Sequence, residues 1–254
     1  MLPTKAQWRP GRPFLVHHID PSIVVVEKKA GLLSQGTTRG EPNLFGQVRD
    51  FIRKRNPQAP LFAVHRLDRV VSGLLVYALT RQSYEHLTDQ FRRHETEREY
   101  WAVARGILPD KEGEIVSHLR TDHPSLKVFS VPERHPKARR AQTAYRVRER
   151  LEAAEATRLT LWLKTGLRNQ IRVQLAEIGH PLLGERKYTD HARSSRAQKR
   201  HRIFLHAGKL GFVHPYTGRN VHFEASLPPD LTRWLAELRR GKSLDAPPAT
   251  GRRR

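Results

Sequence analysis

The middle of the sequence is built from short β-type segments with few residues between them. Each is rich in β-branched or aromatic residues, and the expected strands are 98–105, 113–119, 126–131, 142–149 and 156–165. Strands at this spacing pair as hairpins, because a parallel crossover needs a dozen or more residues and usually a helix. This part of the chain therefore predicts a largely antiparallel sheet.

The flanking segments mix strands with helices. Further strands are expected at 22–28, 72–79 and on both sides of the 214–219 turn, and helices at 44–55, 81–94, 168–179 and 228–240. This order predicts an α+β fold with a mixed, largely antiparallel sheet flanked by helices. We expect residues 1–18 to be irregular and basic. We set the domain limits as a basic irregular arm at 1–13, one catalytic domain at 14–240 and a disordered basic tail at 241–254.

Charge is the strongest global signal. The chain has 47 Lys and Arg against 25 Asp and Glu, a formal net charge of +22. Folding needs no such excess, and the usual reason to keep it is a polyanionic partner, most often nucleic acid. A basic solubility coat is the simpler alternative. The basic residues gather in loop-like stretches at 133–140 and 192–202, where they can reach phosphates.

Several classes of function find no support in the sequence. The chain has no cysteine, so it has no disulfide, thiolate nucleophile or cysteine zinc site. It has no apolar run near 18 residues, no G-x-G-x-x-G, no Walker-type phosphate loop and no H-E-x-x-H, and its 14 His show no metal-ligand spacing. We expect a protein without metal, cofactor or membrane span, cytoplasmic and monomeric by default.

The segment HRLDRVVSGLLVYAL places Asp68 between Arg66 and Arg69, just before an apolar strand. Nearby guanidinium groups keep a carboxylate ionised at neutral pH, which suits a nucleophile or a charge stabiliser better than a general acid. The structural alternative is an Asp that caps a turn and pairs with a surface arginine.

This segment resembles the signature HRLD-x-x-(T/S)-SGLLL of the RluA-type pseudouridine synthases. Other segments resemble motifs of that family in the same order. The segment at 164–188 resembles T-G-R-x-H-Q-I-R-x-H-L-A-x-I-G-H-P-I-x-G-D-x-x-Y. The resembling segments are FLVHHIDPSIVVVEKKAGLLSQG (14–36), EREYWAVARG (97–106), KARRAQTAYRVRER (137–150), KTGLRNQIRVQLAEIGHPLLGERKY (164–188) and FLHAGKLGFVHPYTGRNVHFEASLPPDL (204–231).

The resemblance implies isomerisation of uridine to pseudouridine in structured RNA, ribosomal or transfer, without a cofactor. It implies that Asp68 is the catalytic carboxylate, Tyr100 the active-site tyrosine and Arg172 the ion-pair partner of Asp68. Structural alternatives are core packing for Tyr100 and a solvated helix face for Arg172. Asp68 could stabilise or attack C1′, take the 2′ proton, or attack uracil C6, and the residues do not choose among these routes.

The resemblance also implies RNA contacts. Because a stacked uridine must be flipped out to be reached, we expect His65 and Arg66 to brace the vacated space. Asn169 and Gln170 are also expected to bind the RNA. The basic loop residues expected to contact phosphates are Arg140, Lys187, Arg193, Arg196, Lys199 and Arg200.

Three features depart from the family pattern. Val71 stands where Thr is usual, and Asn169 stands where His is usual. The third is that only some thirteen residues precede the first motif, so we expect a compact member without the N-terminal S4-type RNA-binding domain. Two alternatives stay open: a weakly active or inactive RNA-binding assembly factor on the same scaffold, and a metal-dependent nuclease, for which we find no carboxylate cluster or His pair.

Overall fold

The structure is a computed structural model that describes residues 14–36, 40–122, 125–189 and 202–241. These residues form two compact units. The first unit comprises the residues up to Tyr100 together with His206–Ser226, and the second comprises Trp101–Leu205 and the residues from Leu227 onward. The elements, in chain order, are β1 (Phe14–Ile19), β2 (Ile23–Lys28), α1 (Leu44–Arg53), β3 (Phe62–Ala63), β4 (Ser72–Ala78), α2 (Arg81–Arg93), β5 (Glu97–Arg105), β6 (Glu112–Thr121), β7 (Val128–Ser130), β8 (Arg139–Leu151), η1 (Glu152–Ala154), β9 (Ala156–Leu163), α3 (Gln170–Glu177), β10 (Leu205–Val213), β11 (Asn220–Glu224) and α4 (Pro229–Arg239).

The first unit is a mixed sheet in the order β1-β2-β4-β10, with β11 paired to β10 and β3 paired to β4. The pairs β1–β2 and β2–β4 are antiparallel, whereas β4 and β10 run parallel. Every residue of β4 is buried, as its continuous apolar sequence predicts for a strand covered on both faces.

A glycine sets the distance between the two parallel strands. Gly73 lies opposite Ala207 and has φ +126°, a conformation that side chains of L-residues rarely adopt. A Cβ at this position would lie 2.3 Å from the carbonyl oxygen of Ala207. The Ser-Gly step before the apolar strand is therefore what lets β10 approach β4.

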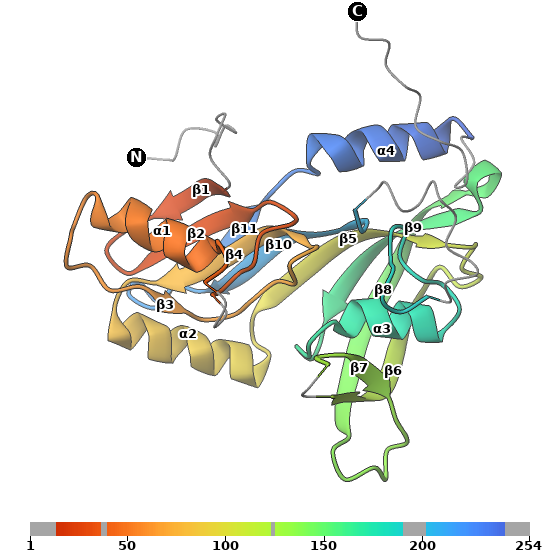
Figure 1. Cartoon of the computed structure of the whole chain (residues 1–254), viewed down its shortest axis with the longest axis horizontal. Coiled ribbons are helices and arrows are strands. Elements are labelled where there is room, and N and C mark those ends of the chain that lie inside the picture. Colours follow the sequence, from red (N-terminus) through yellow and green to blue (C-terminus); the bar gives the residue numbers. More distant parts are fainter. Residues whose placement is uncertain (1–13, 37–39, 123–124, 190–201, 242–254) are drawn as a thin grey trace, which may run out of the picture. The chain divides into compact units, whose positions relative to one another are not determined.

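Helices α1 and α2 belong to this unit (Figure 1). The side chain of Asn43 caps α1 by accepting the N–H of Gly46, and the buried positions of α1 recur at helical spacing. Thr80 caps α2 in the same way, and α2 packs on β3 and β4. Ile23, Val76 and Leu87 are among the buried residues of the core that results.

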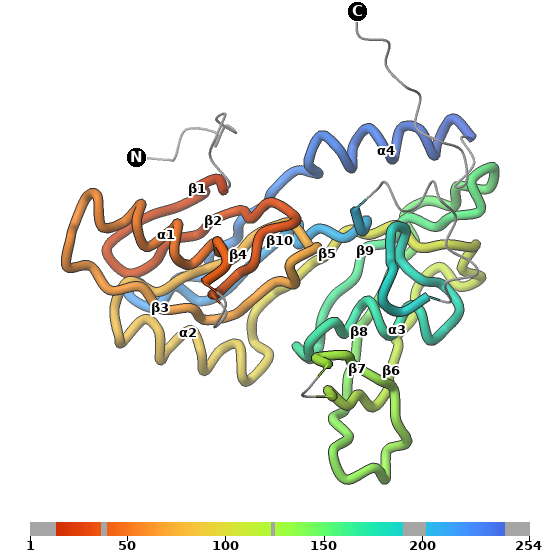
Figure 2. The backbone as a smooth tube through the Cα atoms, viewed as in Figure 1, coloured from red at the N-terminus to blue at the C-terminus, as the bar shows by residue number. Residues whose placement is uncertain are grey.

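The second unit contains the antiparallel order β9-β8-β6-β7, and Figure 2 shows β6, β7 and β8 running side by side. Helix α3 packs on β6 and β7, where the buried amide of Gln174 donates to the Ile115 and Ala141 carbonyls. Helix α4 packs on η1, and Trp234 of α4 is buried with Phe204. None of the helices in the described part of the chain is long and apolar enough to cross a bilayer.

The predicted α+β class, with a mixed and largely antiparallel sheet flanked by helices, is confirmed. The expectation that residues 1–18 are irregular is wrong from residue 14 onward, because Phe14–Ile19 form β1, paired with β2. Its two adjacent histidines obscure the apolar alternation that would mark a strand. Residues 1–13 and 242–254 lie outside the described residues, and the domain limits at 14 and 240 stay a prediction.

Candidate active site

Asp68 lies in the loop between β3 and β4, and the residue before it is held by Ser34. The Ser34 hydroxyl donates to the Leu67 carbonyl at 2.6 Å and accepts the Leu67 N–H at 3.0 Å. Ser34 and Leu67 are both buried, whereas Asp68 is half-buried. The loop thus presents a partly accessible carboxylate from a fixed backbone.

The residue after Asp68 is held by the loop that follows β2. The Arg69 carbonyl accepts the Gly31 N–H at 2.7 Å and the Lys28 ammonium at 3.2 Å. Lys28 is fully buried, and its ammonium also donates to the carbonyls of Lys29 and Leu32 at 3.0 and 2.8 Å. A buried ammonium is tolerated because three carbonyls match its three donors. The turns at 28–34 and 67–69 are therefore joined as one assembly.

The Asp68 carboxylate is close enough to Tyr100 to influence its phenol. Burial raises the pKa of the Tyr100 phenol to about 12; Arg98 lowers it and the Asp68 carboxylate raises it. Tyr100 is therefore protonated throughout the neutral range and can donate a hydrogen bond.

His65 and Arg66 occupy contrasting positions. The His65 ring stacks on Phe91 with 4.3 Å between the ring centroids, and its Nε2 accepts the Val76 N–H at 3.1 Å. Burial, with a smaller contribution from Arg98, lowers the pKa of His65 to about 3, so the ring is neutral. Arg66 is exposed. A role for either in RNA binding stays a prediction.

Arg172 lies on α3 in the second unit, where Glu185 binds it at two points. Its Nε and Nη2 donate to the two carboxylate oxygens of Glu185 at 2.7 and 2.8 Å. Its Nη1 donates to Asn169 Oδ1 at 3.1 Å, and the guanidinium carbon lies 5.3 Å from the centre of the Tyr188 ring. The structural alternative of a solvated helix face does not hold, because Arg172 is only 9% exposed. Its predicted pairing with Asp68 stays a prediction.

Gln170 is a buried structural residue of the same unit. Its Oε1 accepts from the Thr165 hydroxyl and the Leu167 N–H, and its Nε2 donates to the Gln142 carbonyl and the Thr143 hydroxyl. Both donors and both acceptor positions of the amide are thus used. Contact with RNA would require Gln170 to give up one of these bonds, and that role stays a prediction.

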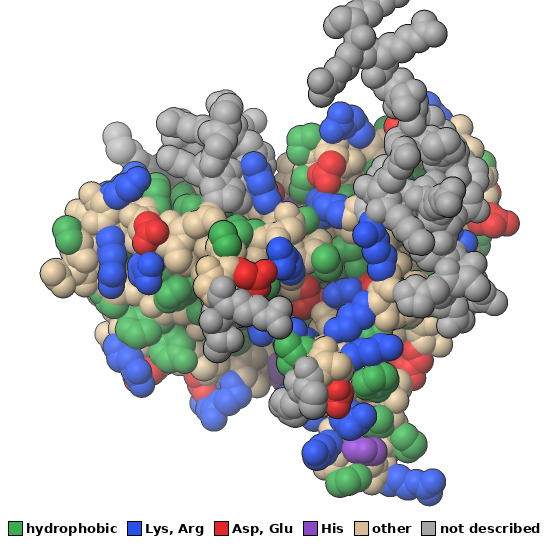
Figure 3. All heavy atoms as spheres, viewed as in Figure 1, with side chains coloured by type: hydrophobic (Ala, Val, Ile, Leu, Met, Phe, Trp, Pro, Cys, Tyr) green, Lys and Arg blue, Asp and Glu red, His purple; other side chains and the backbone are tan. Residues whose placement is uncertain are grey.

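The basic candidates are placed unequally. Arg140 is exposed at the start of β8, and Lys187 is half-buried with its ammonium 2.9 Å from the Leu126 carbonyl oxygen. Figure 3 shows Lys and Arg side chains spread widely over the visible face. The remaining candidates, Arg193, Arg196, Lys199 and Arg200, lie outside the described residues.

Sequence reasoning missed Ser34, Lys28 and Glu185, which hold the site residues in place. Lys28 and Ser34 stand inside the segment at 14–36, and Glu185 stands inside the one at 164–188. Their position within those segments was the sequence signal that could have identified them as candidates. Their partners are distant in the chain or fixed by a turn, so the pairing itself was not visible.

The structure also brings together His18, Asp20 and His214. Both imidazole Nε2 atoms lie within 2.8 Å of Asp20 Oδ2, so each donates to the carboxylate. His214 Nδ1 accepts the N–H groups of Tyr216 and Thr217, which places its proton on Nε2. A metal-bound histidine normally donates from its other nitrogen, so this arrangement fits a hydrogen-bonded clamp between two turns better than a metal site.

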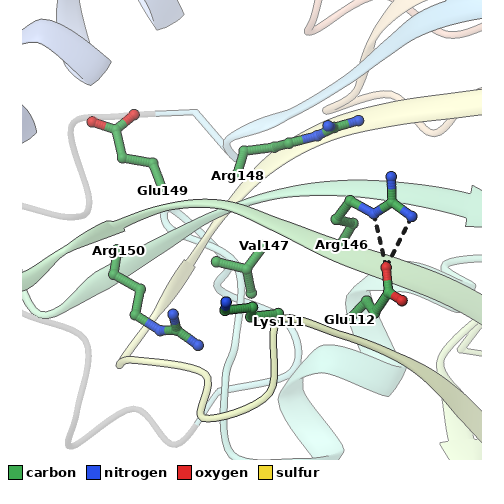
Figure 4. Close-up of a pocket in the computed structure, with 7 residues that line it drawn as sticks. All are labelled: Lys111, Glu112, Arg146, Val147, Arg148, Glu149 and Arg150. Atoms are coloured by element: carbon green, nitrogen blue, oxygen red, sulfur yellow. Dashed lines mark hydrogen bonds and ion pairs between the residues drawn. The ribbon is translucent and has the colours of Figure 1, made fainter.

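A hollow of about 540 Å³ in the second unit is lined largely by charged residues of β8 and the turn before β6 (Figure 4). Arg146 is paired with Glu112 at 2.9 Å, and Arg150 donates to the Leu108 and Pro109 carbonyls. The ion pair offsets the charge of Arg146, and the two carbonyls engage the guanidinium of Arg150. None of the predicted site residues lines it.

Comparison with known proteins decides the family. A model of the RNA pseudouridylate synthase family matches residues 22–177. The chain belongs to this family. It is therefore an isomerase that acts on RNA, as the order of its motifs predicted, and it is of the RluA type.

Two curated relatives illustrate how far the similarity extends across this pseudouridine synthase. The dual-specificity RNA pseudouridine synthase RluA of Escherichia coli K12 is 35% identical over 217 residues, covering 85% of this chain and 94% of that protein. The ribosomal large subunit pseudouridine synthase D of Haemophilus ducreyi is 31% identical over 240 residues, covering 89% of this chain and 71% of that protein.

A solved structure shows the same fold. Human RNA pseudouridylate synthase domain containing 4 superposes with a TM-score of 0.73 at 23% identity, covering 88% of this chain and 92% of the human one. The fold and family of the synthase are thus settled independently of the individual site residues.

Proposed function

We propose that Asp68 is the carboxylate with which this synthase isomerises uridine in folded RNA, assisted by Tyr100 and Arg172. The observation that carries the proposal is the proximity of Asp68 to the buried Tyr100, whose pKa it helps to raise. The two hydrogen bonds between Ser34 and Leu67 support it further, since they fix the backbone beside a half-buried carboxylate.

In the reaction, the bond from ribose C1′ to uracil N1 breaks, a bond from C1′ to C5 forms, N1 gains a proton and C5 loses one. An ionised Asp68 can act at C1′ as the carboxylate of a retaining glycosidase does, take the 2′ proton, or add to C6. We expect Tyr100, protonated and buried, to donate a hydrogen bond and to pack against the flipped base.

Arg172 is proposed as the cation that pairs with Asp68. An ionised carboxylate in a pocket that excludes water has a high desolvation cost unless it is paired with a cation. Arg172 would supply that cation. The fixed orientation of the guanidinium supports the role. A guanidinium has five N–H groups, so the contacts with Glu185 and Asn169 are compatible with a further carboxylate partner.

The substrate is proposed to be ribosomal or transfer RNA with the target uridine in a loop or bulge, where flipping the base costs least. The names of the relatives support more than one substrate class, since one is a dual-specificity RNA enzyme and the other a ribosomal large-subunit enzyme. Exposed Arg66 and Arg140, with Lys187, are proposed to contact the RNA.

The test is release of tritium from RNA labelled at uridine C5, with ribosomal and transfer RNA supplied separately and EDTA present. Asp68→Asn should abolish release and leave RNA binding within a few-fold. Asp50→Asn, an exposed carboxylate on α1, is the matched control and should retain activity.

Activity of Asp68→Asn would overturn the assignment of the carboxylate. Cleavage of the RNA in a parallel assay with Mg²⁺, without tritium release, would favour the metal-dependent nuclease. Tight RNA binding by the wild type, without release from either pool, would favour the assembly-factor alternative.

We also propose that the protein acts as a monomer in the cytoplasm. The absence of cysteine accords with a reducing compartment. Sedimentation equilibrium would check the mass, and a dimer at working concentration would contradict the monomer.

A further inference from the structure

Arg172 is held in one orientation by a buried carboxylate. Glu185 accepts both Nε and Nη2 of the guanidinium, at 2.7 and 2.8 Å. The Glu185 side chain has no exposed surface, and that of Arg172 is 10% exposed. A bidentate contact fixes the plane of a guanidinium as well as its position, and its burial keeps water from replacing the carboxylate.

Glu185 is itself fixed by the backbone. Its Oε1 also accepts the N–H groups of Arg186 and Lys187, at 2.9 and 2.7 Å. The turn before it requires Gly184, which has φ +78° and where a Cβ would lie 2.3 Å from the Arg202 carbonyl oxygen. The carboxylate cannot turn away from Arg172 without also giving up its hydrogen bonds to these two backbone N–H groups.

Asn169 holds the guanidinium from a second direction. Its Oδ1 accepts Arg172 Nη1 at 3.1 Å, and its Nδ2 donates to the Tyr188 hydroxyl at 2.7 Å. Because a guanidinium only donates, the amide oxygen must face it. Asn169 also adopts φ 53°, a left-handed conformation that Asn tolerates better than most residues.

We infer that Glu185, together with Asn169, is a positioning residue that acts on turnover through Arg172 and does not itself contact RNA. The inference rests on the catalytic role proposed for Arg172. Positions 169 and 185 carry Asn and Glu where the family motif has His and Asp, and both contact the same guanidinium. An Asp at 185 is one methylene shorter, so its carboxylate reaches less far toward Arg172 when it accepts the same backbone N–H groups.

The test measures tritium-release kinetics and RNA binding for Glu185→Gln and Glu185→Asp in the full chain. A residue that acts only through Arg172 should lower kcat by about tenfold or more while KM and the RNA Kd stay within about threefold. In an Arg172→Lys background, the same substitutions should lower kcat by less than about threefold further, because the guanidinium that Glu185 orients is already absent.

A matched control separates positioning from stability. Glu149→Gln removes the two-point contact of Glu149 with Arg239, at 2.9 and 2.7 Å, in the same unit. It should leave kcat unchanged. Circular dichroism checks folding, and Glu185→Asp, which keeps the charge, carries the test if Glu185→Gln does not fold.

Three results would overturn the inference. The first is an increase in KM at unchanged kcat, which would mean contact with RNA. The second is a full additional loss of kcat when a Glu185 substitution is added to Arg172→Lys. The third is an active wild type whose kcat is equalled by both Glu185 variants. Full activity of both Glu185 variants would overturn this inference and leave the proposed function standing. A wild-type protein that is inactive on every RNA would overturn both the inference and the proposed function.

Discussion

The hydroxyl of Ser34 and the backbone of Leu67 exchange two hydrogen bonds, at 2.6 and 3.0 Å, immediately before Asp68. The Tyr77 hydroxyl in turn donates to the Ser34 carbonyl at 3.2 Å. These contacts link residues more than thirty positions apart in the chain. The proposed catalytic loop is thus attached to the first unit by buried polar contacts as well as by apolar packing.

Ser34→Ala tests this attachment. Removing the hydroxyl leaves the buried N–H and carbonyl of Leu67 without that partner, so the free energy of unfolding should fall by about 1–3 kcal/mol. Turnover should fall as well, because the backbone beside Asp68 is no longer fixed. Urea unfolding and tritium release measure the two effects. Ser130→Ala, an exposed serine bonded to Glu177, is the control, and an equal effect from both variants would contradict the prediction.

Gly73→Ala tests the approach of β4 to β10. A Cβ at Gly73 would lie 2.3 Å from the Ala207 carbonyl oxygen, on backbone at φ +126°. Strain and overpacking should together cost about 3 kcal/mol or more, or prevent folding. Gly218→Ala is matched in having a positive φ, +67°, but has no atom within 4 Å of the new Cβ, so it should cost only about 1 kcal/mol. Equal melting temperatures for the two variants would refute the steric argument.

His65 should make the protein sensitive to acid. Burial lowers its pKa from 6.5 to about 3, so the unfolded chain binds the proton first as the pH falls. Its contribution to stability is complete above pH 6.5 and is lost between 6.5 and 3, with a slope of up to about 1.4 kcal/mol per pH unit. Unfolding free energies from pH 4 to 7.5 measure the slope. His65→Gln, which keeps an acceptor for the Val76 N–H and does not titrate, should flatten it, and an unchanged slope would assign it to other groups.

Tyr100→Phe tests the phenol. Burial raises its pKa to about 12, so ionisation of Tyr100 should produce no increase in turnover between pH 7 and 10. Loss of the donor should lower kcat by about 10²-fold or more while the ring still packs and RNA still binds. Kinetics of the wild type and Tyr100→Phe across that pH range measure this. Full activity of the variant would remove the hydroxyl from the mechanism and leave only a packing role for Tyr100.

The regular elements were predictable where one local pattern dominated. The helical spacing of apolar residues located α1, and the continuous apolar run located β4 to within one residue. Strand β1 escaped because six residues with two histidines carry little periodic signal and are defined by pairing with β2. The motifs marked Asp68 and Tyr100 as candidate site residues, and the Asp68 carboxylate is one of the charges that affect the Tyr100 phenol.

The sequence by itself determined the fold class, the family and the identity of the proposed catalytic residues, because these are written in local periodicity and in motifs of fixed order. Only the tertiary structure decided what surrounds those residues: Ser34 on Leu67, Lys28 on three carbonyls and Glu185 on Arg172. Such partners are set by burial, since a polar group removed from water must find a matching donor or acceptor wherever the fold supplies one. That matching is a property of three-dimensional proximity, which local spacing does not encode.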